Sequence, residues 1–323
     1  MTVRKLLASF APADVVTIGF LLFLTALNLL FHTQVAEWRQ LVVVNLAISA
    51  LIAFLSYSAE TKETRLMIGL HRWYLYLVVL LIFKELYFMI RPIHPVDYDG
   101  LLIEADRWLF GTDPTVWMTQ FAHPVLTEVL QIAYWSYYLL FIIVGVEIYR
   151  RHTLKSFDKA GFLIVYGFYL SYLGYFLLPA IGPRFTLHDF STIDQELPGL
   201  LLAVPLRDFI NAAESIPAGV PNPAETVQRD VFPSGHTQLS LICVYLAFHF
   251  RLRSRLLVTT FASLLILGTV YLRYHYVVDV LAGGLFFLFT IWSGHHLEKW
   301  WNEKRYWWKN YRDQKESSKK IEG

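Results

Sequence analysis

Long apolar stretches separated by short polar segments set the pattern of this chain. A membrane-spanning helix needs about 20 mostly apolar residues, and eight stretches match or approach that length. They cover residues 14–32, 40–57, 73–91, 126–149, 160–180, 236–250, 256–273 and 277–295. The pattern predicts an all-α, polytopic membrane protein with about eight transmembrane helices, of which the sixth is the shortest.

The composition agrees with this prediction. Hydrophobic residues make up 55% of the 323 residues and charged residues only 17%, which excludes an ordinary soluble domain. The first stretch is too long for a cleavable signal peptide, and no small-residue cleavage site follows it before the next stretch. The single cysteine, Cys243, lies in the sixth stretch, so we expect it to pack rather than to form an internal disulfide.

The basic residues predict an orientation. Eight spans place both termini on one side, where 20 Lys and Arg residues lie, against seven on the opposite side. By the positive-inside rule the termini are cytoplasmic. The basic tail, residues 296–323 with its four tryptophans, is expected to lie on anionic lipid rather than on nucleic acid. A bacterial cytoplasmic membrane with a periplasmic site fits this topology, as does an organelle membrane with a lumenal site.

Two outward-facing segments, residues 92–125 and 181–235, are too long to be simple turns. Each contains a short amphipathic stretch, with apolar residues at helical spacing around Leu101 to Leu109 and from Leu200 to Ile210. Such stretches are typical of helices that lie in the membrane interface. Because long loops often carry or cover a functional site, we expect the chemistry on this side.

The segment Pro233-Ser234-Gly235-His236 stands where the sixth stretch begins. If Pro233 occupies the first helical turn, the next three backbone N–H groups lack intrahelical partners and favour an anion. Gly235 would let a phosphate approach closely, Ser234 offers a hydroxyl, and His236 could donate a proton to a leaving oxygen. The alternative is a helix-start turn with an incidental histidine.

His275 and Asp279 stand between the seventh and eighth stretches. A spacing of four puts them on one helix face, where the carboxylate can orient a neutral imidazole as a nucleophile toward phosphorus. The alternative is a structural His–Asp pair at a helix end. Because the sixth stretch begins and the seventh ends on the same side, we expect His236 and His275 to converge.

Four cationic residues are candidates for binding a phosphate: Lys84, Arg91, Arg184 and Arg273. Arginine suits bidentate phosphate contacts, although an arginine at the end of a span is often only a headgroup anchor. Lys84 lies about two turns inside a span, so it must reach the interface, pair with a group such as Glu85, or line a polar cavity.

These residues together resemble the type 2 phosphatidic acid phosphatase superfamily, whose pattern is K-x6-R-P, then P-S-G-H, then S-R-x5-H-x3-D. Pro233 to His236 match the second motif in full, and His275 and Asp279 match the third. The resemblance implies a six-helix core and, without metal or cofactor, attack of His275 on phosphorus. It also implies that Asp279 orients His275 and that His236 protonates the departing alcohol.

Two departures from the family pattern affect the phosphate contacts. Gly268-Thr269 replaces the Ser-Arg of the third motif, and Arg273 follows one helical turn later. The Lys84 to Pro92 segment matches the first motif but lies 140 residues before Pro233, and the place before the second motif belongs to Gly182-Pro183-Arg184. We therefore expect Arg184 to be the principal phosphate contact and Arg91 the second. The Gly-Pro-Arg element also resembles the inositol phosphorylceramide synthase-like branch.

The sequence therefore predicts an enzyme that acts on a lipid phosphate or phosphodiester at the outer leaflet through a phosphohistidine. The expected organisation is two leading helices in residues 1–72, a phosphatase-like core in 73–295 and a cytoplasmic tail in 296–323. Three alternatives stay open: a lipid headgroup transferase, a transporter of anionic lipids, and a non-catalytic lipid-binding protein. The lipid tail and the oligomeric state are open as well.

Overall fold

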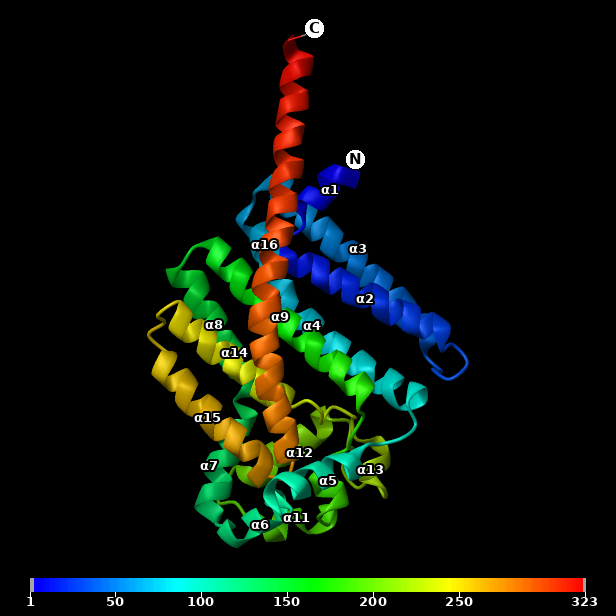
Figure 1. Ribbon diagram of the computed structural model, residues 1–323, viewed down its shortest axis with the longest axis vertical. Helices are drawn as coiled ribbons and strands as arrows, with labels where there is room; N and C mark the ends of the chain where they lie inside the picture. Colours follow the sequence, from blue (N-terminus) through cyan, green and yellow to red (C-terminus); the bar gives the residue numbers. More distant parts are fainter. Residues whose placement is uncertain (1–2, 322–323) are drawn as a thin grey trace. The chain divides into compact units, whose positions relative to one another are not determined.

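The computed structural model describes the backbone of residues 3–321 and the side chains of residues 4–310, and the secondary structure over that range is helical, without a strand (Figure 1). The helices are α1 (Val3–Ser9), α2 (Pro12–Leu30), α3 (Trp38–Lys62), α4 (Arg65–Ile93), α5 (Asp99–Phe110), α6 (Pro114–Trp117), η1 (Met118–Phe121), α7 (Pro124–Trp135), α8 (Tyr137–Arg151), α9 (Leu154–Leu177), α10 (Pro183–Thr186), η2 (Phe190–Thr192), α11 (Ile193–Glu196), α12 (Ala203–Ala213), α13 (Pro223–Thr226), α14 (Gly235–His249), α15 (Arg255–Tyr271) and α16 (Val277–Ile321).

The all-α membrane architecture predicted from the sequence is confirmed. Among the described residues, five helices are long and apolar enough to cross a membrane: α2, α3, α4, α9 and α16. A sixth span results if α7 and α8 are counted together, although they are bent by 49°. The helices of the sixth and seventh stretches, α14 and α15, have only 15 and 17 residues. The count of eight spans therefore stays a prediction.

The bend between α7 and α8 interrupts the stretch that the hydropathy pattern presented as one span. It falls at Ser136, whose hydroxyl donates to the carbonyl of Ala133 at 2.7 Å. Serine back-bonding of this kind competes with the helical ladder and bends helices. A hydropathy pattern records the apolar length of a segment but not such a break.

The chain divides into two compact units. One comprises the residues up to Phe88, Leu154–Tyr166 and the residues from Phe289 onward; the other comprises Met89–Thr153 and Gly167–Leu288. In the first unit, α2 lies beside α3 (Figure 1). Glu85 on α4 is buried there and accepts hydrogen bonds from Asn28 at 3.1 Å and Asn45 at 2.7 Å. Polar contacts of this kind hold helices together within a membrane.

The tail of the chain is helical, because α16 continues beyond the apolar stretch. Three of its side chains make protein contacts where the sequence predicted lipid contacts. Arg305 and Lys309 pair with Glu60 at 3.3 and 2.5 Å, and the indole of Trp301 donates to the carbonyl of Phe10 at 2.9 Å. These contacts attach the tail to the other helices of the first unit.

In the second unit, α15 packs against α7 and α14, and α14 packs against α8 (Figure 1). Both long loops contain the helices that the amphipathic stretches predicted, as α5 and α12. Helix α12 begins at Ala203, later than Leu200, because Glu128 on α7 accepts the backbone N–H groups of residues 200–203 at 2.6 to 3.2 Å. The loops thus pack onto the helices of this unit.

Candidate active site

The start of α14 differs from the prediction in two respects. Ser234 is the N-cap, so Pro233 precedes the helix instead of occupying its first turn. The N–H group of Ser234 is also not free, since it donates to the carbonyl of Asp279 at 3.0 Å. The Ser234 hydroxyl accepts the N–H of Thr237 at 3.2 Å. The N–H groups of Gly235 and His236 are the first two of the helix and have no carbonyl within it.

Close packing explains two glycines at this helix start. A Cβ on Gly235 would lie 2.4 Å from the hydroxyl of Tyr175, and a Cβ on Gly283 of α16 would lie 2.5 Å from the carbonyl oxygen of Ser234. Both distances are below any normal contact. Helix α16 therefore packs onto the beginning of α14 at a point where only glycine fits.

His275 lies in the turn before α16, so it does not share a helix face with Asp279 as the spacing predicted. The two side chains are nevertheless close, with 3.6 Å between His275 Nδ1 and Asp279 Oδ2. That oxygen accepts the N–H of Tyr276 at 2.9 Å. Asp279 therefore holds the turn by a hydrogen bond, and its nearby oxygen favours a proton on the Nδ1 atom of His275.

The two histidines meet as predicted. His236 Nδ1 and His275 Nε2 are 3.3 Å apart. When His275 carries its proton on Nδ1, its Nε2 atom presents a lone pair, and the proton between the rings belongs to His236. The prospective nucleophilic atom and the prospective acid proton then face each other.

His275 is enclosed, with 3% of its surface exposed. It lies between α15 and α16, outside the spanning helices. Burial, together with the neighbouring His236, lowers the pKa of His275 well below its ordinary value of 6.5. The imidazole is therefore neutral at pH 7, as a nucleophile must be.

Aromatic rings surround His236. Its ring centroid lies 4.6 Å from that of Tyr134 and 4.5 Å from that of Tyr137. Tyr134 stacks in turn on Tyr274, with centroids 4.2 Å apart. Nothing in the sequence pointed to these tyrosines, because they belong to no motif. Tyr134 on α7 and Tyr137 on α8 meet the histidine only through tertiary packing.

Arg184 is the predicted cation that joins the two histidines. It is 4% exposed, and its guanidinium carbon lies 4.8 Å from the ring centroid of Tyr274. Its guanidinium binds Glu214, and it donates to the Asn211 side chain at 3.1 Å. A phosphate that binds Arg184 must share it with this carboxylate or replace the carboxylate.

Arg184, His236 and His275 line one small cavity, together with Tyr134, Ile181, Glu214, Asp230, Val231 and Tyr274. Its volume is about 10 Å³, roughly the room of one water molecule. A phosphoryl group is larger, so the side chains that line the cavity must separate when one binds.

The other predicted cations lie elsewhere. Arg273 is buried and pairs with Glu196 at 2.6 Å. Burial and the positive charge of Arg273 lower the pKa of the nearby His188 to about 4. Arg91 is partly exposed and pairs with Glu225. Lys84 belongs to the first compact unit, whereas the cavity lies in the second. Of the predicted cations, only Arg184 lines the cavity.

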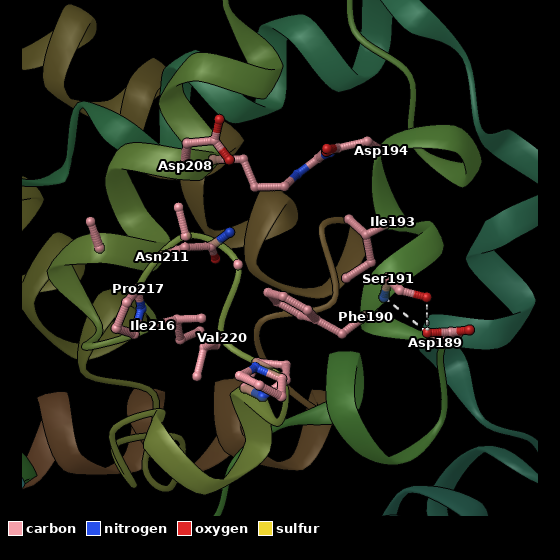
Figure 2. A pocket seen from close by; sticks show the side chains of 16 residues that line it. Asp189, Phe190, Ser191, Ile193, Asp194, Asp208, Asn211, Ile216, Pro217 and Val220 are labelled. Carbon is pink, nitrogen blue, oxygen red and sulfur yellow. Dashed lines mark hydrogen bonds and ion pairs between the residues drawn. The ribbon is translucent and has the colours of Figure 1, made fainter.

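The second unit also has a larger cavity, of about 660 Å³ (Figure 2). Asn211 lines it and also binds Arg184. The ring of Phe190 projects into this cavity, and Asp189 is hydrogen bonded to Ser191 at its edge (Figure 2). Its lining is otherwise mixed polar and apolar and comes entirely from residues 189–223.

Comparison with known proteins gives one family. The model of the PAP2 superfamily matches residues 101–293, which include α5 from Leu101 onward, Arg184, both histidines and Asp279 and exclude Lys84 and Arg91. Comparisons with curated proteins and with solved structures give no match. Because the family model covers more than half of the chain, this membrane protein belongs to the PAP2 superfamily, whose members generally hydrolyse or transfer phosphoric esters.

Proposed function

We propose that the protein is a membrane-embedded lipid phosphate phosphatase or phosphotransferase that acts without a metal, through a phosphohistidine on His275. The observation that carries the proposal is the 3.3 Å contact between His236 Nδ1 and His275 Nε2 in a cavity shared with Arg184. A neutral nucleophile, an acid proton and a fixed positive charge then lie within reach of one phosphorus atom.

In the first step, His275 Nε2 attacks phosphorus. The N–P bond forms as the bond from phosphorus to the lipid oxygen breaks. His236, an imidazolium once the phosphate anion is bound beside it, gives a proton to that oxygen and becomes neutral, so the lipid leaves as an alcohol. Arg184 and the N–H groups of Gly235 and His236 stabilise the charge on the phosphoryl oxygens. Asp279 stabilises the positive charge that His275 acquires.

In the second step, water or an alcohol attacks the phosphoryl group. The N–P bond breaks, His275 returns to its neutral form, and His236 takes up the proton of the attacking hydroxyl. Water gives inorganic phosphate, whereas a second alcohol gives a new phosphoric ester. The 660 Å³ cavity beside Arg184 supports headgroup transfer as a second candidate, because it has room for a polar headgroup or acceptor.

The proposed location follows from the charge pattern and the loops. We propose that the termini are cytoplasmic and that the site opens at the outer face of a bacterial cytoplasmic membrane. The substrate would then enter from the outer leaflet. A transporter of anionic lipids would use the same cationic site without forming a covalent bond.

The test is phosphate release by the purified protein in detergent, with chelator present and with His275→Ala as the control. The panel contains phosphatidate, diacylglycerol pyrophosphate, a sphingoid phosphate and a polyprenyl pyrophosphate. Release that depends on His275 and survives chelation supports the phosphatase. Transfer to an added lipid alcohol without release supports the transferase, and movement of intact lipid across vesicles by wild type and His275→Ala alike supports the transporter.

A further inference from the structure

Helix α5 carries two carboxylates that face inward. Its amphipathic pattern predicts a helix in the membrane interface, and Trp108 is indeed exposed. Asp99 and Asp106, however, are only 5% and 2% exposed. A buried carboxylate needs hydrogen-bond partners, and those of both residues are backbone or side-chain groups beside the proposed active site.

Asp106 caps the start of α16. Its two oxygens accept the N–H groups of Val277 at 2.9 Å and Val278 at 2.8 Å. Asp279 accepts the N–H of Tyr276, so three consecutive donors directly after His275 all bind carboxylates. The N-terminus of α16 is therefore already neutralised by an anion of this chain.

Asp99 binds the two loop segments that carry the site residues Arg184 and His275. It accepts the N–H groups of Ile181 at 3.0 Å and Gly182 at 2.8 Å, and the hydroxyl of Tyr276 at 2.8 Å. The first two groups lie three and two residues before Arg184, and Tyr276 directly follows His275. One carboxylate thus connects the phosphate-binding segment to the nucleophile segment.

The two segments are also in direct backbone contact. The N–H of Arg184 donates to the carbonyl of Arg273 at 3.1 Å. Gly182 has a φ of +94°, and a Cβ there would lie 2.8 Å from the carbonyl oxygen of Tyr274. The Asp99 contacts therefore reinforce a crossing that tolerates little displacement.

We propose that Asp99 and Asp106 are positioning residues of the reaction. Asp99 sets Arg184 relative to His275. Asp106 holds the turn that carries His275 and, by occupying the start of α16, leaves the start of α14 as the helix end that receives the substrate phosphate. This inference rests on the proposed function, since it concerns the geometry of the same step.

The test compares Asp99→Asn, Asp106→Asn and Asp106→Ala with Glu104→Gln, a change at an exposed carboxylate of the same helix. A misplacement of about 1 Å can cost about 10²-fold in rate. We expect kcat to fall about 10- to 100-fold in both Asn variants and further in Asp106→Ala, with KM changed less than about threefold. Glu104→Gln should match wild type.

Tyr276→Phe provides a second variant that removes one hydroxyl and no charge. The variant removes the hydrogen bonds of this hydroxyl to Asp99 and Thr186. We expect kcat to fall about threefold to tenfold, the size of effect typical of a hydrogen bond, and the melting temperature to change little. An unchanged kcat in Tyr276→Phe and in both Asn variants would overturn this inference alone. Full activity of His275→Ala would overturn the proposed function and this inference with it.

Discussion

At the scale of single residues, the proposal requires distinct roles for the two histidines. If His236 protonates the leaving oxygen, its loss matters most for a poor leaving group. We expect His236→Ala to slow cleavage of an alkyl lipid phosphate by about 10²–10⁴-fold. Cleavage of an aryl phosphate should slow far less, because its phenolate leaves without protonation. Steady-state rates with both substrates give the comparison, and equal losses would show that His236 is not the acid.

The enclosed position of His275 predicts the pH dependence. Its pKa lies below 6.5, so the neutral, nucleophilic form persists as the pH falls through 6.5 and is lost only at lower pH. The acid limb of kcat/KM, corrected for ionisation of the substrate phosphate, should therefore have its midpoint below pH 6.5. A midpoint above this value would mean that His275 is not desolvated in the free enzyme.

Arg184 and Arg91 provide a matched pair of arginines. Arg184 is buried and lines the cavity with both histidines, whereas Arg91 pairs with Glu225 outside it. Removing a preorganised charge donor costs about 10²–10³-fold, which is the loss in kcat/KM that we expect for Arg184→Ala. Arg91→Ala should stay within about threefold of wild type. The reverse order would identify Arg91 as the principal phosphate contact.

The sequence predicted that His236 and His275 would converge, because each motif stands at the same side of its apolar stretch. It could not predict Tyr134 or Glu214 as neighbours. Tyr134 lies on α7 and Glu214 directly follows α12. Neither belongs to a motif, and both reach the cavity only through tertiary packing. The spacing of four between His275 and Asp279 also could not show that His275 precedes α16. The start of that helix is capped by Asp106, which belongs to a distant segment of the sequence.

At the scale of helices, the fit of α16 on α14 is an exacting contact. A Cβ at Gly283 would strike the Ser234 carbonyl, whereas a Cβ at the adjacent Gly284 meets nothing within 4 Å. We expect Gly283→Ala to displace the start of α14 and to lower both activity, by at least about tenfold, and the melting temperature.

Gly284→Ala is the matched control for this contact. Alanine favours a helix over glycine by about 1 kcal/mol, so Gly284→Ala should keep full activity and melt at the same temperature or higher. Thermal unfolding and turnover of both variants in detergent provide the measurement. Equal behaviour of the two would mean that this helix contact does not control the site.

Amphipathic patterns predicted that α5 and α12 exist, but not what they contact. A pattern separates a polar from an apolar face and does not say whether the polar face meets solvent or backbone donors. On α5, Asp99 and Asp106 bind buried N–H groups, while Trp108 is exposed. Helix α5 therefore also builds the interior of the candidate site.

At the scale of the whole molecule, hydropathy was sufficient to predict an all-α membrane protein but not the number of spans. Chain breaks such as the one at Ser136 and short helices such as α14 change the count without changing the hydropathy. The division at residues 72 and 295 stays a prediction. The family match from residue 101 onward agrees with the motifs that the sequence offered.

The predicted orientation can be tested because the chain has one cysteine. In a Cys243→Ala background, Gln195→Cys lies in the long loop before α14 and Glu303→Cys lies beyond the apolar part of α16, both at exposed positions. A membrane-impermeant maleimide should label Gln195→Cys in intact cells and Glu303→Cys only after permeabilisation. The opposite pattern would reverse the topology.

The most direct measurement for the proposed chemistry is capture of the covalent intermediate. Wild-type protein is mixed with phosphorus-labelled lipid phosphate and quenched in alkali, in which phosphohistidine survives, and the labelled peptide is mapped by mass spectrometry. We predict that the phosphoryl group is on His275 and that labelling is lost in His275→Ala. Turnover by wild type with label on another residue, or with no covalent label at any time, would contradict the phosphohistidine mechanism.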